Sequence, residues 1–201
     1  GQTSVSLCID CPTGKYQTQN GSTVCSSCPV GKYNSNSGAN LSSACQVCTA
    51  GKYQSNMSSS ICTDCSTGRY KEETESISID ACLACQPGRY NNLTGSAESS
   101  ACLPCIAGKY QSNAGQASCT NCASGRYSTG SAQTEISACK YCEWGKYQPS
   151  SSSTSCIDCI PGKYGDISGG TSSSDACKDC KPGKYQPYSG GSTIFSCKSC
   201  E

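Results

Sequence analysis

One nine-residue pattern recurs through this chain and constrains its fold more than any other feature. The pattern C-x-x-C-x-x-G-[KR]-Y occurs ten times in 201 residues, and an eleventh C-x-x-C follows at Cys197 and Cys200. All 22 cysteines belong to these eleven pairs. A period this regular is the signature of a repeat architecture, in which each unit packs against its neighbours along the chain.

The repeats are numbered 1 to 10 from their first cysteines. These are Cys8, Cys25, Cys45, Cys62, Cys82, Cys102, Cys119, Cys139, Cys156 and Cys177. Residues 1–201 are predicted to form one continuous array with a truncated eleventh repeat at 197–201, as a window on a longer array. The lengths of the repeats vary only between the Tyr and the next Cys, and the order short, long, short, long, long occurs twice. This order indicates two five-repeat blocks, 8–101 and 102–196; a coincidence of segment lengths is the alternative.

The composition argues against a conventional hydrophobic core. The chain contains one Phe, one Met and one Trp, whereas cysteine is above the level that marks a disulfide scaffold. Small units that cannot bury enough apolar surface are held together by crosslinks. We therefore predict small disulfide-rich repeats in an elongated solenoid or rod of short β-hairpins and turns, with one disulfide per repeat of 17–21 residues.

The residues shared by all repeats predict a common local structure. The Lys/Arg-Tyr dipeptide and the residues around the next Cys are expected to pair as two short antiparallel strands. The preceding Gly is expected to need a positive φ or a close backbone approach. The Lys or Arg should point away from the Tyr face, either as a solvated column or as a partner for acidic groups or glycans on adjacent chains. A helical turn is predicted at 71–75.

Tyr is the large apolar side chain that every repeat possesses. We expect its ring to pack on a neighbouring disulfide or on the next repeat. The alternative is a ladder of Tyr and Lys that binds glycans or partners. The predicted packing column consists of Tyr16, Tyr33, Tyr53, Tyr70, Tyr90, Tyr110, Tyr127, Tyr147, Tyr164 and Tyr185.

The C-x-x-C pairs could form disulfides, bind zinc or act as redox centres. Two such pairs describe a structural zinc site, but eleven pairs cannot all combine into four-Cys sites and the chain has no His. A thioredoxin-like motif needs a helix start beside a βαβ pattern, which nothing in the sequence supplies. We therefore predict disulfides formed in an oxidising compartment, with no metal and no cofactor.

The most economical connectivity joins the second Cys of each pair to the first Cys of the next pair. The predicted bridges are Cys11–Cys25, Cys28–Cys45, Cys48–Cys62, Cys65–Cys82, Cys85–Cys102, Cys105–Cys119, Cys122–Cys139, Cys142–Cys156, Cys159–Cys177 and Cys180–Cys197. Cys8 and Cys200 are left over, each for a partner outside this sequence or on a neighbouring subunit. A crossed ladder, from the first Cys of one pair to the second Cys of the next, is the alternative.

Sugar attachment is predicted in the variable segments. The N-x-[ST] sequons are at Asn20, Asn40, Asn56 and Asn92, where a glycan could point into solvent. The Ser runs 150–153 and 172–174 are candidates for O-linked sugars.

Several functional classes are disfavoured by the sequence. The net charge of +1 is scattered and gives no footprint for nucleic acid, and no apolar run approaches the length of a membrane span. Without His the usual general base is missing, and no nucleophile elbow or phosphate-binding glycine loop is present. We therefore predict that the protein is not an enzyme and has no catalytic residues.

The motif, with its Ser- and Gly-rich return to the next Cys, resembles the ephrin-receptor-like cysteine-rich repeat from Cys8 to Cys200. It is also similar to the first module of tumour necrosis factor receptor cysteine-rich domains, in which the Cys before P-x-G-x-Y pairs with the Cys that opens the next C-x-x-C. The crossed-disulfide module that alternates with it in those receptors is missing from this sequence. The resemblance therefore implies the paired Cys, the Gly and the Tyr of each copy, and it favours long structural arrays over a cytokine receptor.

Together these features predict an extracellular structural glycoprotein, secreted, at the cell surface or in a matrix. Rigidified by its disulfide ladder, it would form or contribute to a fibril, surface hair, stalk or matrix, with self-association into a fibre or array and with N-linked and O-linked glycans. The alternative is the ligand-binding ectodomain of a cell-surface receptor or adhesion protein.

Overall fold

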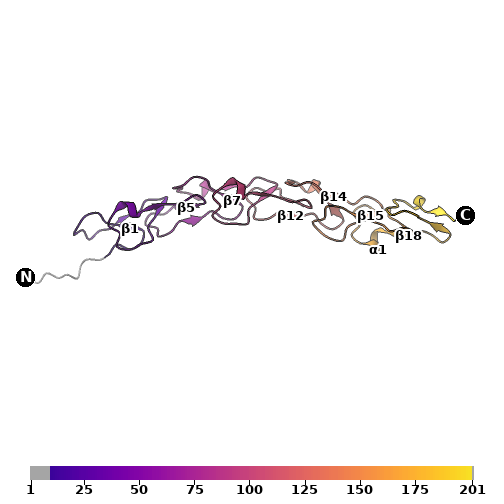
Figure 1. Ribbon diagram of the computed structural model, residues 1–201, viewed down its shortest axis with the longest axis horizontal. Helices are drawn as coiled ribbons and strands as arrows, with labels where there is room; N and C mark the ends of the chain where they lie inside the picture. The colour runs from indigo at the N-terminus through magenta and orange to yellow at the C-terminus, as the bar shows by residue number, and fades with distance from the viewer. Residues whose placement is uncertain (1–9, 201) are drawn as a thin grey trace, which may run out of the picture. The chain divides into compact units, whose positions relative to one another are not determined.

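The computed structural model describes residues 10–200 (Figure 1). Cys8, the first cysteine of repeat 1, lies outside the described residues. The chain forms two compact units. Unit 1 comprises Gly1–Cys85, Asn91–Leu103 and Gly115–Ala117, and unit 2 comprises Gln86–Tyr90, Pro104–Ala114 and Ser118–Glu201. Within each unit the repeats follow one another in chain order (Figure 1).

The repeats are built on hairpins of two-residue strands. The Lys/Arg-Tyr dipeptide of one repeat pairs antiparallel with the two residues between the cysteines of the next C-x-x-C, so that Tyr53 faces Thr63 and Tyr147 faces Ile157. In unit 1 the paired strands are β1 (Lys15–Tyr16) with β2 (Ser26–Ser27), β3 (Lys32–Tyr33) with β4 (Gln46–Val47), β5 (Lys52–Tyr53) with β6 (Thr63–Asp64), and β7 (Arg69–Tyr70) with β8 (Leu83–Ala84).

Unit 2 repeats the same arrangement. Its paired strands are β11 (Lys109–Tyr110) with β12 (Thr120–Asn121), β13 (Arg126–Tyr127) with β14 (Lys140–Tyr141), β15 (Lys146–Tyr147) with β16 (Ile157–Asp158), β17 (Lys163–Tyr164) with β18 (Lys178–Asp179), and β19 (Lys184–Tyr185) with β20 (Lys198–Ser199). Strands β9 (Arg89–Tyr90) and β10 (Leu103–Pro104) come from repeat 5 and the start of repeat 6. The predicted fold class of small disulfide-rich repeats with short hairpins is therefore confirmed.

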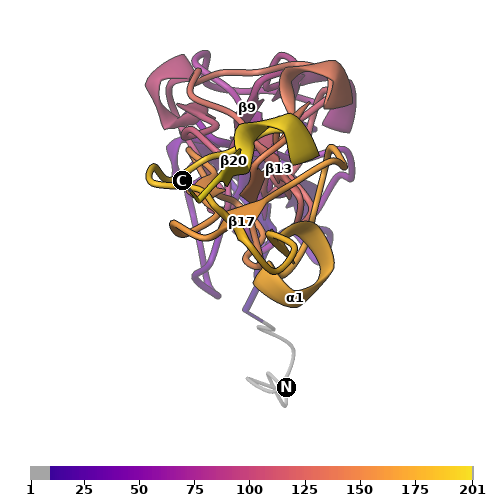
Figure 2. The ribbon, with the colours of Figure 1, turned by 90° about the vertical axis from the view of Figure 1, so that its right-hand side faces the viewer.

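The long repeats differ from the short ones by a single helical turn before the next Cys. The turns are η1 (Ser42–Ala44), η2 (Ile79–Ala81), η3 (Ser99–Ala101), η4 (Ile136–Ala138), α1 (Ser173–Ala176) and η5 (Ile194–Ser196). In η2 the hydroxyl of Ser78 accepts from the backbone N–H of Asp80, which caps the turn as Ser commonly does. Figure 2 shows α1 on the outside of unit 2. The extra residues are thus absorbed in a turn, and the hairpins keep the same two-residue strands.

In repeats 1 to 8 the Gly of the Gly-[KR]-Y triplet lies against the backbone of the repeat two places further on. Its φ lies between +75° and +85° in all ten triplets, the left-handed region that favours glycine. A Cβ at Gly51 of repeat 3 would lie 2.0 Å from the carbonyl oxygen of Gly95 in repeat 5, and one at Gly125 of repeat 7 would lie 2.2 Å from that of Gly169 in repeat 9. The prediction of positive φ and close backbone approach is confirmed.

Adjacent repeats are joined by three backbone hydrogen bonds that recur with little change. Between repeats 3 and 4 the N–H of Gly51 donates to Lys71 (2.8 Å), that of Gln54 to Ser76 (2.9 Å), and that of Glu75 back to Cys48 (2.8 Å). The equivalent bonds between repeats 8 and 9 run from Gly145 to Gly165 (3.0 Å), from Gln148 to Gly170 (2.9 Å) and from Gly169 to Cys142 (2.8 Å). Backbone groups near the cystines are therefore satisfied by the next repeat, as buried polar groups require.

The buried layer consists of cystines and of the residue that follows each Tyr. Cys28, Cys48 and Cys65 have no exposed surface, and Asn34 and Asn91 are each 1% exposed. The Tyr rings are only half-buried, except for Tyr185, which is exposed. Tyr147 does pack against Cys159, Ala176 and Cys177 in unit 2. The Tyr rings therefore supply only part of the packing, because cystines and hydrogen-bonded amides fill most of the interior.

The helical turn predicted at 71–75 is wrong. These residues form a bend in which Glu75 has a φ of +57°, a conformation that cannot continue a right-handed helix. The bend places the N–H of Glu75 on the carbonyl of Cys48 in the preceding repeat. The contact between repeats therefore overrides the local preference of a Lys- and Glu-rich segment for helix.

The close approach at Gly51 can be tested against Gly183, which has the same φ of +82° but nothing within 4 Å of its Cβ position. We expect Gly183→Ala to reduce the free energy of unfolding by about 1–2 kcal/mol, because Ala must adopt the left-handed conformation there. Gly51→Ala should cost about 1–3 kcal/mol more, because its methyl group must push repeat 5 away. Hydrogen exchange of the amides in repeats 3 to 5 measures the difference. Equal protection in the two variants would contradict the interlocking of alternate repeats.

Candidate functional site

The disulfide ladder is the dominant chemical feature of the structure. Each second cysteine is bonded to the first cysteine of the next pair, with Cα–Cα separations of 5.5 to 5.8 Å, within the ordinary range for disulfides. The bonded pairs are Cys11–Cys25, Cys28–Cys45, Cys48–Cys62, Cys65–Cys82, Cys85–Cys102, Cys105–Cys119, Cys122–Cys139, Cys142–Cys156, Cys159–Cys177 and Cys180–Cys197. These are the pairs of the economical ladder and not those of the crossed alternative. Cys200 is an exposed free thiol.

Each bridge closes the open end of a hairpin loop. The residues that it joins are 14 to 18 apart in sequence. In the chain-entropy model a loop of this size loses unfolded-state entropy equivalent to about 3 kcal/mol. The ladder therefore stabilises each loop locally, and the hydrogen bonds between repeats add to it.

A glutamine fastens the loop of each short repeat, and in repeats 3, 6 and 8 it is buried. In repeat 6 the side-chain N–H of Gln111 donates to the carbonyl of Ser118 (2.8 Å), and its oxygen accepts from the backbone N–H of Asn113 (3.0 Å). Gln54 of repeat 3 and Gln148 of repeat 8 make the equivalent bonds. One side chain thus spans the loop from its first residue to the residue before the Cys.

Asparagine at the same position in two long repeats acts between repeats. The side-chain N–H of Asn34 donates to the carbonyl of Lys15 in repeat 1, and that of Asn91 donates to the carbonyl of Arg69 in repeat 4, both at 3.0 Å. Sequence reasoning missed these buried amides. The available signal was the Gln that follows Tyr in every short repeat.

Several Lys and Arg residues of the triplets are paired within the chain. The hairpin register places Lys52 opposite Asp64, Lys146 opposite Asp158 and Lys163 opposite Asp179, with N–O distances of 2.6, 2.9 and 2.7 Å. The expected alternatives were a column of solvated lysines and pairing with acidic groups or glycans on adjacent chains. Cross-strand pairing within one hairpin was missed because it depends on the register of strands only two residues long.

The four sequon asparagines, Asn20, Asn40, Asn56 and Asn92, are all exposed. All four belong to the segments of unit 1. Each side chain is therefore accessible for modification.

Neither a metal site nor a membrane span is found among residues 10–200. No group of three or more His, Cys, Asp or Glu side chains in this range is arranged to hold a metal ion. No helix within it is long and apolar enough to cross a membrane.

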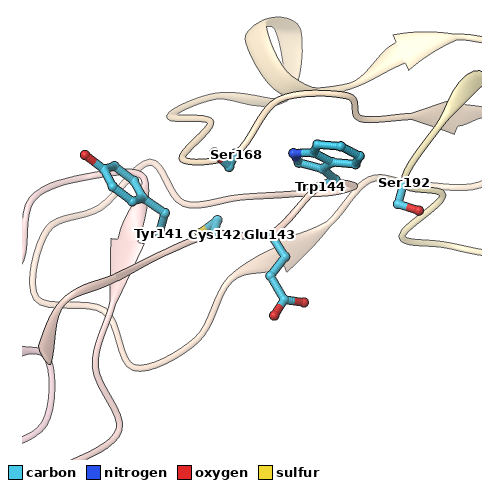
Figure 3. Close-up of a pocket in the computed structure, with 6 residues that line it drawn as sticks. All are labelled: Tyr141, Cys142, Glu143, Trp144, Ser168 and Ser192. Atoms are coloured by element: carbon cyan, nitrogen blue, oxygen red, sulfur yellow. The ribbon is translucent and has the colours of Figure 1, made fainter. Parts of the chain in front are cut away.

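A hollow of 410 Å³ in unit 2 departs from the uniformity of the repeats. It is lined by Tyr141, Cys142, Glu143, Trp144, Ser168 and Ser192 (Figure 3). Trp144 lies between the two serines, whereas the carboxylate of Glu143 points away from the indole (Figure 3). Sequence reasoning did not single out this site, although Trp144 is the one Trp of the chain.

The fold and the ladder define a protein of the extracellular cysteine-rich repeat class. Residues 1–45, 37–82, 93–139 and 130–176 match the family model described as tyrosine-protein kinase ephrin type A/B receptor-like. The chain therefore belongs to this ephrin-receptor-like family, as its motif predicted. A search of curated proteins finds no match. The disulfide ladder and the family together point to an extracellular domain.

The order of the matches follows the order of the repeats. They end at Cys45, Cys82, Cys139 and Ala176, in each case after a short repeat followed by a long one. Repeat 10, from 177 to 196, is left unmatched. The two five-repeat blocks stay a prediction.

The buried glutamines give a second test of the fold. Gln111→Ala removes the amide group that bonds to Ser118 and Asn113, so the carbonyl of Ser118 loses its side-chain donor. We expect the loss to lower the free energy of unfolding by about 1–3 kcal/mol. The exposed Gln86 is the matched control, because exposed substitutions usually change stability by less than about 0.5 kcal/mol. Limited proteolysis of the oxidised protein should cut the 111–118 loop faster in the first variant only. Equal cleavage in both variants would rule out the fastening role.

The pH dependence of stability should be flat around neutrality. Hydrogen bonding to Asp158 raises the pKa of Lys146, and the bond between Lys178 and Asp166 raises the pKa of the lysine and lowers that of the carboxyl. A lowered carboxyl pKa gives stability that is lost only as the pH falls through the folded value, and a raised lysine pKa gives stability lost only as the pH rises through it. Both transitions lie outside the range from about pH 5 to pH 9, and the chain has no His. Thermal unfolding followed by circular dichroism should therefore show a constant midpoint across that range, and a step within it would contradict these pairings.

Proposed function

We propose that this chain is a structural glycoprotein of a fibril, surface hair, stalk or extracellular matrix, secreted or held at the cell surface. The residues common to the repeats connect one repeat to another. The cysteines form disulfides between successive pairs, and the glycines allow close contact with the next-but-one repeat. Backbone groups form hydrogen bonds with the next repeat. The acids that a catalytic site would need, such as Asp64 and Asp158, are paired with lysines. These features support a mechanical role without enzymatic activity.

The observation that carries the proposal is the covalent path through the ladder. Starting at Cys11, the path crosses a disulfide to Cys25, follows the backbone for three residues to Cys28, and crosses the next disulfide to Cys45. Every loop between bonded cysteines is bypassed in this way. A disulfide adds 5.5 to 5.8 Å per repeat, and the C-x-x-C backbone adds about 10 Å when extended. Tension along the chain is therefore borne by covalent bonds even when the loops unfold.

This path predicts a large effect of reduction on extensibility. The oxidised segment from Cys11 to Cys200 should reach a contour length of about 160 Å, because ten bridges and ten short backbone segments carry the load. Reduction should release the loops and increase the contour length to about 650 Å, or about fourfold. Single-molecule force spectroscopy with and without a phosphine reductant measures both lengths. An oxidised chain that extends as far as the reduced one would refute the load-bearing ladder.

Self-association into a fibre or array and glycosylation belong to the same proposal. The exposed sequons and the Ser runs 150–153 and 172–174 are the attachment points. Electron cryo-microscopy of native material should show helical or lattice order, and intact mass before and after deglycosylation should show the sugars. Dispersed monomers without attached sugars would contradict this part of the proposal.

A ligand-binding ectodomain of a receptor or adhesion protein is the second candidate. The observation that favours it is the hollow beside Trp144, because the common framework of the repeats does not require it. A monomeric stalk that binds one protein ligand in the same microscopy would favour the ectodomain over the fibre.

A further inference from the structure

Repeat 8 departs from the pattern on both sides of Cys142. Tyr141 occupies the second position between the paired cysteines, where the other pairs have Asp, Ser, Val, Ala, Pro or Asn. Trp144 occupies the position before the Gly, where the other nine repeats have Thr, Val, Ala, Pro or Ser. The fold therefore needs no aromatic side chain at either position.

Neither aromatic residue contributes to the interior. Tyr141 is 56% exposed and Trp144 is 53% exposed, whereas Cys142 between them is fully buried. Exposed aromatic surface gives up the stabilisation that burial would provide. Two such residues in one hollow therefore indicate a binding surface rather than a packing requirement.

The Tyr141 side of the hollow is held in place before any ligand arrives. The guanidinium of Arg126 lies 3.6 Å from the centre of the Tyr141 ring and donates to its hydroxyl. Arg126 also donates to the carbonyl of Cys139 at 3.1 Å. The backbone of Gly169 lies against the same ring, since a Cβ there would be 2.6 Å from a ring carbon. A fixed wall of this kind reduces the entropy lost on binding.

The chemistry of the lining selects the class of ligand. The half-exposed indole of Trp144 offers an apolar face, and Ser168 and Ser192 flank it with hydroxyl groups (Figure 3). A purely apolar ligand would leave these hydroxyl groups without hydrogen bonds. A phosphate is disfavoured because the guanidinium of Arg126 already donates to the hydroxyl of Tyr141. A pyranose ring combines an apolar C–H face with a rim of hydroxyl groups. We propose that this hollow binds a sugar ring stacked on Trp144.

The distribution of sequons indicates where such a sugar would come from. Asn20, Asn40, Asn56 and Asn92 all precede the hollow in the chain and belong to unit 1, whereas the hollow belongs to unit 2. Glycans on these asparagines, including those of another copy of the chain, are therefore one source of the sugar. A free saccharide would present the same chemistry, and the two sources can be separated by experiment. This binding site does not depend on the structural role proposed above, because saccharide binding can be measured on a single chain.

The single Trp makes the site directly observable. Titration of the oxidised chain with methyl α-mannoside and with diacetylchitobiose should produce a saturable change in Trp emission, since Trp144 is the only source of that signal. In calorimetry, Trp144→Ala should weaken binding by at least about tenfold. This substitution should fold, because Ala50 and Ala107 occupy the same position in repeats 3 and 6. Non-reducing peptide mapping checks its bridges.

The control is Tyr188→Ala, which removes an aromatic side chain that is 72% exposed and lies outside the hollow. It should bind with unchanged affinity. Tyr141→Ser, with the residue that repeat 2 has at Ser27, should weaken binding by several-fold. No saturable change with a panel of hexoses and N-acetylhexosamines would overturn the proposal. Unchanged affinity in the Trp144→Ala variant would overturn it as well.

Enzymatic removal of N-glycans from native material separates the two sources. If a glycan of another copy occupies the hollow, deglycosylation should increase acrylamide quenching of Trp144. Unchanged quenching, together with binding of the soluble saccharide, would support the site and assign it to a free saccharide.

Discussion

The structure depends on the close approach of a glycine to a backbone carbonyl two repeats further along the chain. At Gly51 and Gly125 a methyl group would lie 2.0 and 2.2 Å from that oxygen, so no other residue fits without displacement. The positive φ at the same position turns the chain so that the following Lys/Arg-Tyr strand enters its hairpin. Since the triplet glycines of repeats 1 to 8 contact the next-but-one repeat, their hairpins are held by more than the immediate neighbour. Short strands with little apolar surface can be stable under that condition.

The disulfides and the hydrogen bonds perform different tasks. The bridges close loops, and with the C-x-x-C segments they form a continuous covalent path from Cys11 to Cys200. The hydrogen bonds between repeats fix the orientation of each repeat on the next, for example from Gln54 to Ser76. Covalent closure alone would leave a chain of linked loops without a defined orientation. Backbone pairing alone would lack the apolar burial that usually supports it.

Positions at which one repeat differs from the others show where the fold tolerates substitution. The position between the cysteines accepts Asp64 as a partner for Lys52, and Tyr141 as a partner for Arg126. Both choices satisfy the cation on the opposite strand, by charge or by the ring face. Tyr141 also lines the hollow that Trp144 borders. Binding chemistry can thus be added to one repeat without changing its framework.

The sequence by itself determined the local chemistry. The repeat, the positive φ of its glycine and the resemblance to the family follow from the C-x-x-C-x-x-G-[KR]-Y pattern, because each depends on residues close together in the chain. The pattern favoured the ladder of ten bridges, and the structure decided between it and the crossed ladder. Tertiary structure alone decided what lies between repeats: the buried amide of Asn34, the pairing of Lys52 with Asp64, the bend at Glu75 and the hollow at Trp144. These features depend on which residue of one repeat meets which residue of another. That register is set by backbone contacts across 20 residues or more, such as Gly51 with Gly95, and no local pattern encodes it.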